Sequence, residues 1–199
     1  GVRRVFVGSK DPNPKVNGKG IRQLRKAGIE VSTNILKQEC HALIEDFSHC
    51  LKTGRPQITC KVAISLDGKL ATSSGQSQWI SNAKTRGFVH KLRDQLDGIM
   101  IGAGTLRADN PRLTVRTTKK ERFTKVVIVD SGLSFSARHK LWQRRAGEVI
   151  VACTAKASQA KRAKVARQGH EVLVCRADKL GRVSMNELMK KLASKGFCS

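Results

Sequence analysis

Aromatic residues are scarce in this chain: its 199 residues include no tyrosine, two tryptophans and six phenylalanines. Few aromatic side chains leave few platforms on which nucleic-acid bases can stack, and no helix-turn-helix or zinc-finger pattern is present. No apolar run approaches the roughly 20 residues of a membrane-spanning helix. The first residues also lack the apolar centre of a signal peptide. These absences argue against a membrane segment and disfavour a nucleic-acid partner.

Several catalytic and metal-binding patterns are missing as well. The sequence holds no H-E-x-x-H motif, no P-loop and no Ser-His-Asp set, so hydrolase and nucleotide-triphosphatase functions have no support. The six cysteines form no C-x-x-C pair and have no histidine at metal-ligand spacing. Most of them fall in predicted strands or helices, which favours reduced core thiols. We therefore expect a cytoplasmic protein with no metal site in this chain.

Acidic residues are few: the chain has 15 Asp and Glu and 39 Lys and Arg, which gives a net charge of +24. Such an excess favours anionic partners, either nucleic acid or small phosphorylated ligands. The charge is spread along the chain, and its densest stretches are residues 138–145 and 156–167. The second stretch is typical of the solvated face of a helix. A basic surface without a specific partner is therefore the simpler interpretation.

What the sequence does contain is an alternation of strand and helix patterns. This alternation predicts an α/β fold with a mostly parallel sheet, whose ligands gather at the carboxyl ends of the strands. The Gly- and Pro-containing loop at 52–56 predicts a domain boundary. In the last helix a capping box and four inward side chains are expected, namely Ser184 with Glu187, and Met185, Leu188, Met189 and Leu192. Strands are expected at 2–8, 29–35, 57–66, 97–102, 125–131, 147–154 and 170–177, and helices at 18–28, 36–51, 81–96, 156–167 and 184–196.

Small and polar residues follow three of the expected strands, at 65–67, 102–105 and 130–131. The sequence GAGT at 102–105 allows backbone N–H groups to approach an anion, with a tight turn as the alternative. It is not a G-x-G-x-x-G motif, because Arg107 occupies the last glycine position. Arg93 and Arg116 lie where guanidinium groups could bind phosphate, although a surface role is the simpler interpretation. Asp67 and Asp109 are expected to serve in turns or caps.

Three motifs, taken in their order along the chain, say more about the function than these residues do one at a time. KVAISLDGKLATSSGQSQWIS, DGIMIGAGTLRADNPRLTVR and VIVDS resemble the reductase domain of the bacterial bifunctional riboflavin-biosynthesis deaminase/reductase family. The resemblance is close over residues 54–131 and only general past about 140, while residues 1–31 resemble the end of the family's deaminase domain. It implies a dihydrofolate-reductase-like α/β domain over 54–199, incomplete at its C-terminus. Residues 1–53 would then be the last strands and helices of a cytidine-deaminase-like domain.

The resemblance also implies an activity and a set of site residues. The activity is NADPH-dependent reduction of 5-amino-6-(5-phosphoribosylamino)uracil to its ribitylamino product, by hydride addition to C1′ of the ring-opened imine. Such a transfer needs positioning and a dry pocket more than a strong acid or base. Lys61 would lie near the reacting sugar as the catalytic residue. The implied cofactor contacts are Ala63, Trp79, Thr105, Asp109 and Ser131, and the implied substrate contacts are Ser77, Arg93, Leu113 and Arg116.

The family's zinc motifs, H-x-E and P-C followed by a second cysteine, do not occur in this chain. Zinc and deaminase activity would therefore belong only to a missing deaminase part. The chain begins with Gly inside an expected strand, and the family's E-G-G/A-P segment would follow residue 199, so we expect an internal fragment. The family usually dimerises through its reductase domains, which implies a homodimer. Two alternatives remain open, a basic nucleic-acid-binding module and a non-catalytic remnant of the reductase.

Overall fold

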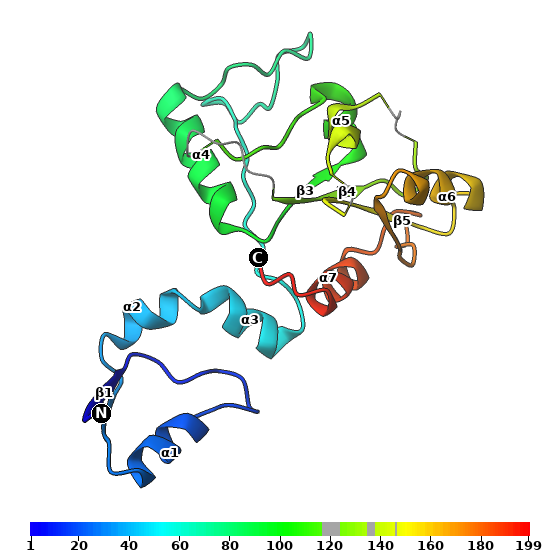
Figure 1. The fold of residues 1–199 in the computed structure, drawn as a ribbon. Coiled ribbons are helices and arrows are strands. Elements are labelled where there is room, and N and C mark those ends of the chain that lie inside the picture. Colours follow the sequence, from blue (N-terminus) through cyan, green and yellow to red (C-terminus); the bar gives the residue numbers. More distant parts are fainter. Residues whose placement is uncertain (117–123, 135–137, 146) are drawn as a thin grey trace. The chain divides into compact units, whose positions relative to one another are not determined.

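The computed structural model describes residues 1–116, 124–134, 138–145 and 147–199 (Figure 1). The chain divides into two units, one formed by residues 1–57 with 190–199 and the other by residues 58–189. Across the described residues, every helix is too short or too polar to cross a membrane.

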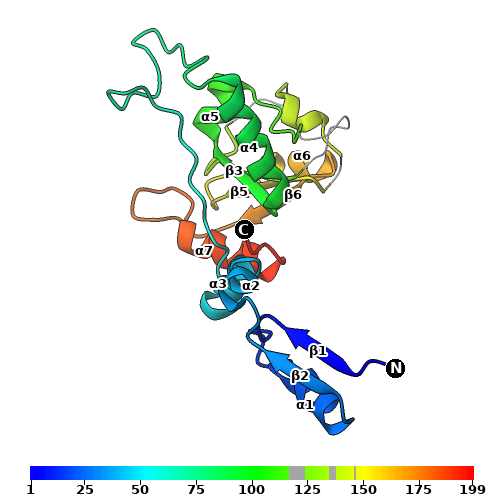
Figure 2. The ribbon, with the colours of Figure 1, turned by 90° about the vertical axis from the view of Figure 1, so that its left-hand side faces the viewer.

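The first unit contains a strand–helix–strand element made of β1 (Arg4–Val7), α1 (Lys19–Lys26) and β2 (Glu30–Thr33). The two strands pair in parallel and lie side by side, with α1 beside them (Figure 2). Their register places Arg4 opposite Glu30, and the two side chains form an ion pair with a 2.9 Å separation between Nε and Oε2. The strands and the helix expected in this region are confirmed.

The single helix expected over 36–51 is wrong. The structure has two helices here, α2 (Lys37–Ala42) and α3 (Glu45–Thr53), which are separated at Ile44 by a backbone with φ −118° and ψ 16°. The apolar spacing is the same for one continuous helix and for two successive ones. It therefore cannot report a change in dihedral angles at a single residue.

The second unit is built on a four-stranded parallel sheet in the order β3-β4-β5-β6. Parallel strands need crossover connections, and helices supply most of them here. The alternation of strands and helices expected from residue 81 onward is confirmed, including a helix that begins with Asn82 as its N-cap. The elements are α4 (Ala83–Gln95), β3 (Gly98–Gly102), α5 (Ala103–Asp109), β4 (Lys125–Val129), η1 (Lys140–Gln143), β5 (Val149–Cys153), α6 (Gln159–Arg167) and β6 (Glu171–Val174). The last helix, α7 (Met185–Ser194), begins in this unit, and its residues from 190 onward belong to the first.

The core of this unit lies on the sheet face that α5 and α6 cover (Figure 1). β4 and β5 are the inner strands, and their continuous apolar runs are buried on both faces, as parallel strands require. Successive side chains of a strand point to opposite faces, so alternate residues of each strand enter this core. The core residues on this face are Leu106, Leu113, Val126, Ile128, Leu133, Leu141, Val149, Val151, Cys153, Ala157 and Val165.

The strand expected at 57–66 is absent from the structure. Residues 57–65 pair with no strand among the residues that the structure describes, and a turn follows at 66–67. The alternate apolar side chains that suggested a strand are exposed, with Val62 at 60% and Ile64 at 53%. An alternating pattern shows that a segment can pair, but a strand forms only where a neighbouring strand accepts its hydrogen bonds.

The last helix agrees with the sequence in part. Leu188, Met189 and Leu192 are buried as expected, but Met185 is 44% exposed because it occupies the first helical turn. The N–H of Glu187 approaches the Ser184 Oγ at 3.5 Å, while the Glu187 carboxylate accepts the N–H of Arg176 at 3.0 Å. The capping box is therefore only half formed, because the carboxylate has an alternative partner.

A buried histidine lies at the amino-terminal end of β6. His170 is 3% exposed, and its ring lies 4.9 Å from the ring of Trp142. Burial lowers the pKa of His170, and the backbone of Trp142 and the charge of Glu148 oppose this shift. The imidazole is thus held neutral in the folded protein.

We expect the folded state to lose stability as the pH falls below about 6.5, the ordinary pKa of histidine in an unfolded chain. In this window the unfolded state binds the proton more readily than buried His170, so acidification favours unfolding by about 1.4 kcal/mol per unit of pKa difference. Urea unfolding followed by fluorescence at about pH 7.5 and 5.5 measures the loss. His170→Phe keeps a ring beside Trp142 and should show a smaller acid loss. An equal loss in the variant would contradict the assignment.

Candidate active site

The carboxyl ends of β3 and β4 bring two predicted site segments to one edge of the sheet. The register pairs Gly102 with Val129, so residues 102–105 and 130–131 leave neighbouring strands at the same level. Gly102 is the N-cap of α5 and makes no side-chain capping bond. A Cβ added at Gly102 or Gly104 would meet nothing within 4 Å. The first turn of α5 therefore has no side-chain cap for its backbone N–H groups, and the exposed Thr105 lies in the same turn.

The loop after β4 is held by its own hydrogen bonds. The buried Asp130 carboxylate accepts the N–H of Gly132 at 3.2 Å and both the N–H and hydroxyl of Ser134 at 2.7 and 3.0 Å. The Ser131 Oγ accepts the N–H of Val183 at 3.1 Å. A hydroxyl that accepts in this way still has its own proton to donate. Ser131 is thus fixed in place while keeping a donor for a ligand.

Two cations at this loop were missed by the sequence analysis. Arg107 donates to the Ser134 Oγ at 3.0 Å, and the Lys161 Nζ donates to the Gly132 carbonyl at 3.3 Å. Arg107 drew notice only as a departure from a glycine motif, and Lys161 only as part of a basic helix. Neither position could be linked to residues 131–134 without the fold, because contacts between α5, α6 and this loop are long-range.

The predicted substrate residues Arg93 and Arg116 meet at Thr114. Arg93 Nη1 donates to the Thr114 carbonyl at 3.4 Å, and Arg116 Nε donates to the Thr114 hydroxyl at 3.2 Å. Leu113, the preceding residue, is buried and has a φ of 51°, which turns the chain back toward α4. The structure therefore brings together two arginines that are 23 residues apart in the sequence.

Arg93 and Arg116 carry like charges that act on one another. Arg93 is partly buried, and burial together with the neighbouring Arg116 charge lowers the pKa of its guanidinium. The group still carries its charge at neutral pH. Burial and the same two arginines lower the pKa of His90. A dianion placed between the guanidinium groups would relieve their repulsion, as in bidentate phosphate recognition.

Four other predicted site residues lie on the segment between residues 58 and 82, which forms turns but no helix or strand. Lys61 is exposed, while Ala63 and Ser77 are half-buried. Trp79, an implied cofactor contact, is 71% exposed, with the Arg86 guanidinium 4.3 Å from its ring centroid. Within the described residues, the structure does not join these four side chains to the sheet edge by any hydrogen bond.

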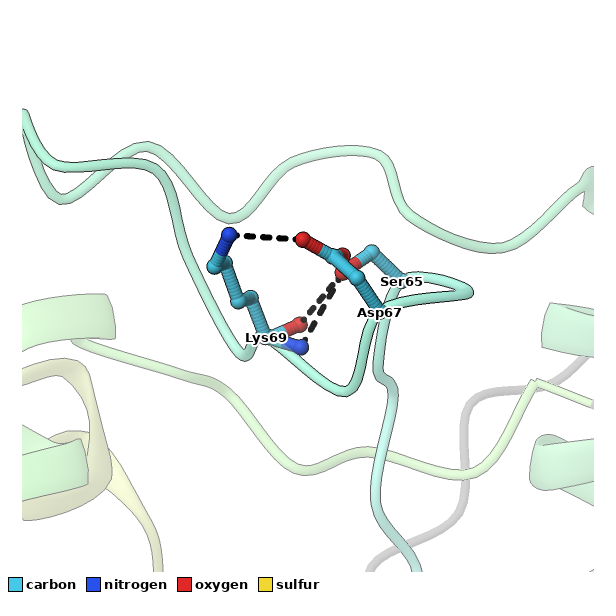
Figure 3. A network of polar contacts seen from close by, with 3 residues as sticks. All are labelled: Ser65, Asp67 and Lys69. Atoms are coloured by element: carbon cyan, nitrogen blue, oxygen red, sulfur yellow. Dashed lines mark hydrogen bonds and ion pairs between the residues drawn. The ribbon is translucent and has the colours of Figure 1, made fainter.

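Asp67 and Asp109 occupy different settings. Ser65, Asp67 and Lys69 close a turn in which the Asp67 carboxylate accepts the Ser65 hydroxyl and pairs with the Lys69 ammonium at 2.6 Å (Figure 3). The hydrogen bonds from Lys69 and Ser65 lower the pKa of Asp67, and its expected turn role is confirmed. Asp109 is the exposed last residue of α5. In the part of the chain that the structure describes, no group of three or more His, Cys, Asp and Glu could hold a metal ion.

Comparison with known proteins agrees with this fold. Residues 56–199 match the family described as the RibD C-terminal domain. The riboflavin biosynthesis protein RibD of Actinobacillus pleuropneumoniae is 40% identical over 192 residues, which cover 96% of this chain and 50% of the relative. The structure of Acinetobacter baumannii RibD, form 1, matches with a TM-score of 0.83 and 29% identity, over 98% of this chain and 52% of that one.

A second structural neighbour is named by its two activities. It is a diaminohydroxyphosphoribosylaminopyrimidine deaminase/5-amino-6-(5-phosphoribosylamino)uracil reductase from Thermotoga maritima, with a TM-score of 0.80 and 32% identity. The match covers 99% of this chain and 52% of that one, so the chain spans about half the length of the relatives it matches. The predicted reductase-type α/β fold is confirmed, and the chain belongs, through residues 56–199, to the RibD C-terminal domain family.

Proposed function

We propose that this chain carries the reductase part of a riboflavin-biosynthesis enzyme, which reduces 5-amino-6-(5-phosphoribosylamino)uracil to its ribitylamino product with NADPH. The observation that carries the proposal is the family match over residues 56–199. The Thermotoga maritima neighbour, titled both a deaminase and a reductase, supports it. Because the chain spans about half of such proteins, the deaminase activity and its zinc belong to a longer parent in this proposal.

The substrate phosphate is assigned to Arg93 and Arg116. Their convergence on Thr114 supports this role, because a bound dianion stabilises the partly buried charge of Arg93 beside the charge of Arg116. Leu113 would form part of the wall beside them, since it is buried directly before Thr114. Ser77 is the remaining proposed substrate contact and rests on the family resemblance.

The donors at the sheet edge fit a ligand that carries several phosphates. The uncapped backbone N–H groups at the start of α5, the Thr105 hydroxyl and the Ser131 hydroxyl can donate to phosphate oxygens. Arg107 and Lys161 add positive charge at the adjoining loop. When bound, NADPH supplies the hydride. Ala63, Trp79 and Asp109 complete the proposed cofactor contacts, from the family resemblance.

The reduction adds a hydride to C1′ of the ring-opened imine and a proton to its nitrogen. Lys61 is the proposed catalytic residue, with its ammonium stabilising charge near the sugar and orienting the sugar hydroxyls. Trp79 would exclude water from the reacting atoms, since a large indole ring covers apolar surface while its N–H can still find a partner. Lys61 and Trp79 both lie on the segment between residues 58 and 82. In this proposal, that segment supplies the side chains nearest the reacting sugar.

We further propose that the protein is a cytoplasmic homodimer that binds no nucleic acid. All six cysteines are free thiols, which supports a reducing compartment. The division into a deaminase part at 1–53 and a reductase part at 54–199 belongs to the same proposal. It is supported by the start of the family match at residue 56.

Titrating the 199-residue chain with NADPH tests the function. Saturable quenching of tryptophan fluorescence is expected, and Trp79→Phe should lose most of it while Trp142→Phe keeps it. Loss of the reduced-nicotinamide absorbance after addition of the phosphoribosylaminouracil then measures turnover. Salt-sensitive binding of single-stranded DNA with no response to NADPH would instead favour a nucleic-acid-binding module and overturn the proposal.

A further inference from the structure

His90 belongs to the same side-chain cluster as the arginine pair, although no motif in the sequence singles it out. It lies on α4 three residues before Arg93, so both side chains emerge from one face of the helix. Its Nδ1 accepts the backbone N–H of Arg116 at 3.2 Å. One turn further on, Arg93 holds the Thr114 carbonyl. The segment 114–116 is thus fastened to α4 at two points.

The geometry points to His90 as a positioning residue that sets Arg116 beside Arg93 for recognition of a sugar phosphate; this inference rests on the proposed function. Arg116 donates its backbone N–H to His90 and its Nε to the Thr114 hydroxyl. Together they define where its side chain starts and in which direction it leaves. Losing the first bond would leave the guanidinium charge intact but let the main chain of Arg116 move away from α4.

The acceptor role requires a neutral imidazole with its lone pair on Nδ1. Partial burial and the charges of Arg93 and Arg116 both lower the pKa of His90, whereas the nearby Thr114 carbonyl raises it. The lowering causes dominate, so His90 is neutral at physiological pH. A third positive charge beside two arginines is thereby avoided, and the bond to the Arg116 N–H is kept.

Two substitutions separate positioning from packing. His90→Leu replaces the imidazole by an apolar side chain of similar size and so removes the hydrogen-bond acceptor. His90→Asn places an amide oxygen, which can accept a hydrogen bond, near the position of Nδ1. The probe is ribose 5-phosphate, titrated calorimetrically into the 199-residue chain at about pH 7.5. We expect His90→Leu to weaken binding about 5-fold, as for one neutral hydrogen bond, and His90→Asn to recover most of that loss. Ribose without phosphate should bind all three forms equally weakly.

Equal affinities for wild type and His90→Leu would overturn the role of His90, and so would an equally weak His90→Asn variant. Thermal unfolding of each variant provides the structural control, since the positioning role predicts different affinities at similar midpoints. If the wild-type chain itself fails to bind ribose 5-phosphate, the proposed phosphate site fails and His90 has nothing to position. Tight wild-type binding that survives His90→Leu would instead leave the arginine site standing without its positioning residue.

Discussion

Replacing Arg93 and Arg116 together by methionine is expected to weaken ribose 5-phosphate binding by at least about 100-fold. Each guanidinium would donate charge-assisted hydrogen bonds, and such bonds are worth about 1.5–3 kcal/mol apiece. The pair already meets at Thr114, so both groups can address one phosphate without rearranging the loop. In the turnover assay the loss should appear mainly in kcat/KM. Methionine keeps an unbranched side chain at the partly buried Arg93 site.

Arg112 provides the matched control for this prediction. It is an exposed arginine on the same loop, so Arg112→Met removes the same charge with little change in affinity. Single Arg93→Lys and Arg116→Lys variants test geometry, because lysine keeps the charge but loses the planar fork. A double methionine variant that binds ribose 5-phosphate within 3-fold of wild type would remove the arginine pair from the site.

Truncating Leu106 to alanine is expected to cost about 3 kcal/mol of the free energy of unfolding. Leu106 is fully buried on α5 and packs in the core cluster with Ile128 and Val151. Removing it loses transfer free energy and leaves a cavity, a combination that typically costs 2–5 kcal/mol. Urea unfolding measures the change. Leu180→Ala is the control, since Leu180 is exposed and its truncation should cost less than about 0.5 kcal/mol.

The same substitution should also weaken NADPH binding, because Leu106 anchors the helix whose first turn faces the proposed cofactor phosphates. Natural domains have only about 5–15 kcal/mol of stability, so the alanine variant risks unfolding. Leu106→Val is the milder version, with an expected cost of about 1 kcal/mol, and it should show the same order of effects. Unchanged stability in both variants would show that α5 is not held by this side chain.

Short apolar runs were enough to predict the sheet of the second unit. β4 and β5 are continuous apolar segments between turn residues, and only an inner parallel strand buries such a run on both faces. The arginine pair was predicted from the resemblance, and the structure places both side chains against Thr114. His90, Arg107 and Lys161 were not predicted, because their roles depend on long-range contacts that no local pattern records.

The failures have a common cause. The spacing of apolar residues shows which side chains of a helix or strand would share a face. It does not show which neighbouring strand would pair with the segment, nor the φ and ψ angles of single residues. Residues 57–65 alternate like a strand yet have no ladder, and the break at Ile44 leaves the apolar spacing of 36–51 intact. The positive φ value of Leu113, on the loop that carries Arg116, is equally invisible, because leucine rarely adopts this conformation.

The extended segment at 57–65 also bears on how this chain behaves at high concentration. Its backbone groups lack a ladder partner and its alternate apolar side chains face water, which makes it a template for β-pairing between molecules and hence for aggregation. A net charge of +24 keeps the molecules apart through mutual repulsion. Added salt screens that repulsion without covering the apolar side chains. The colloidal stability of the chain is therefore greatest at low ionic strength, where repulsion between the lysine and arginine charges of different molecules opposes β-pairing through residues 57–65.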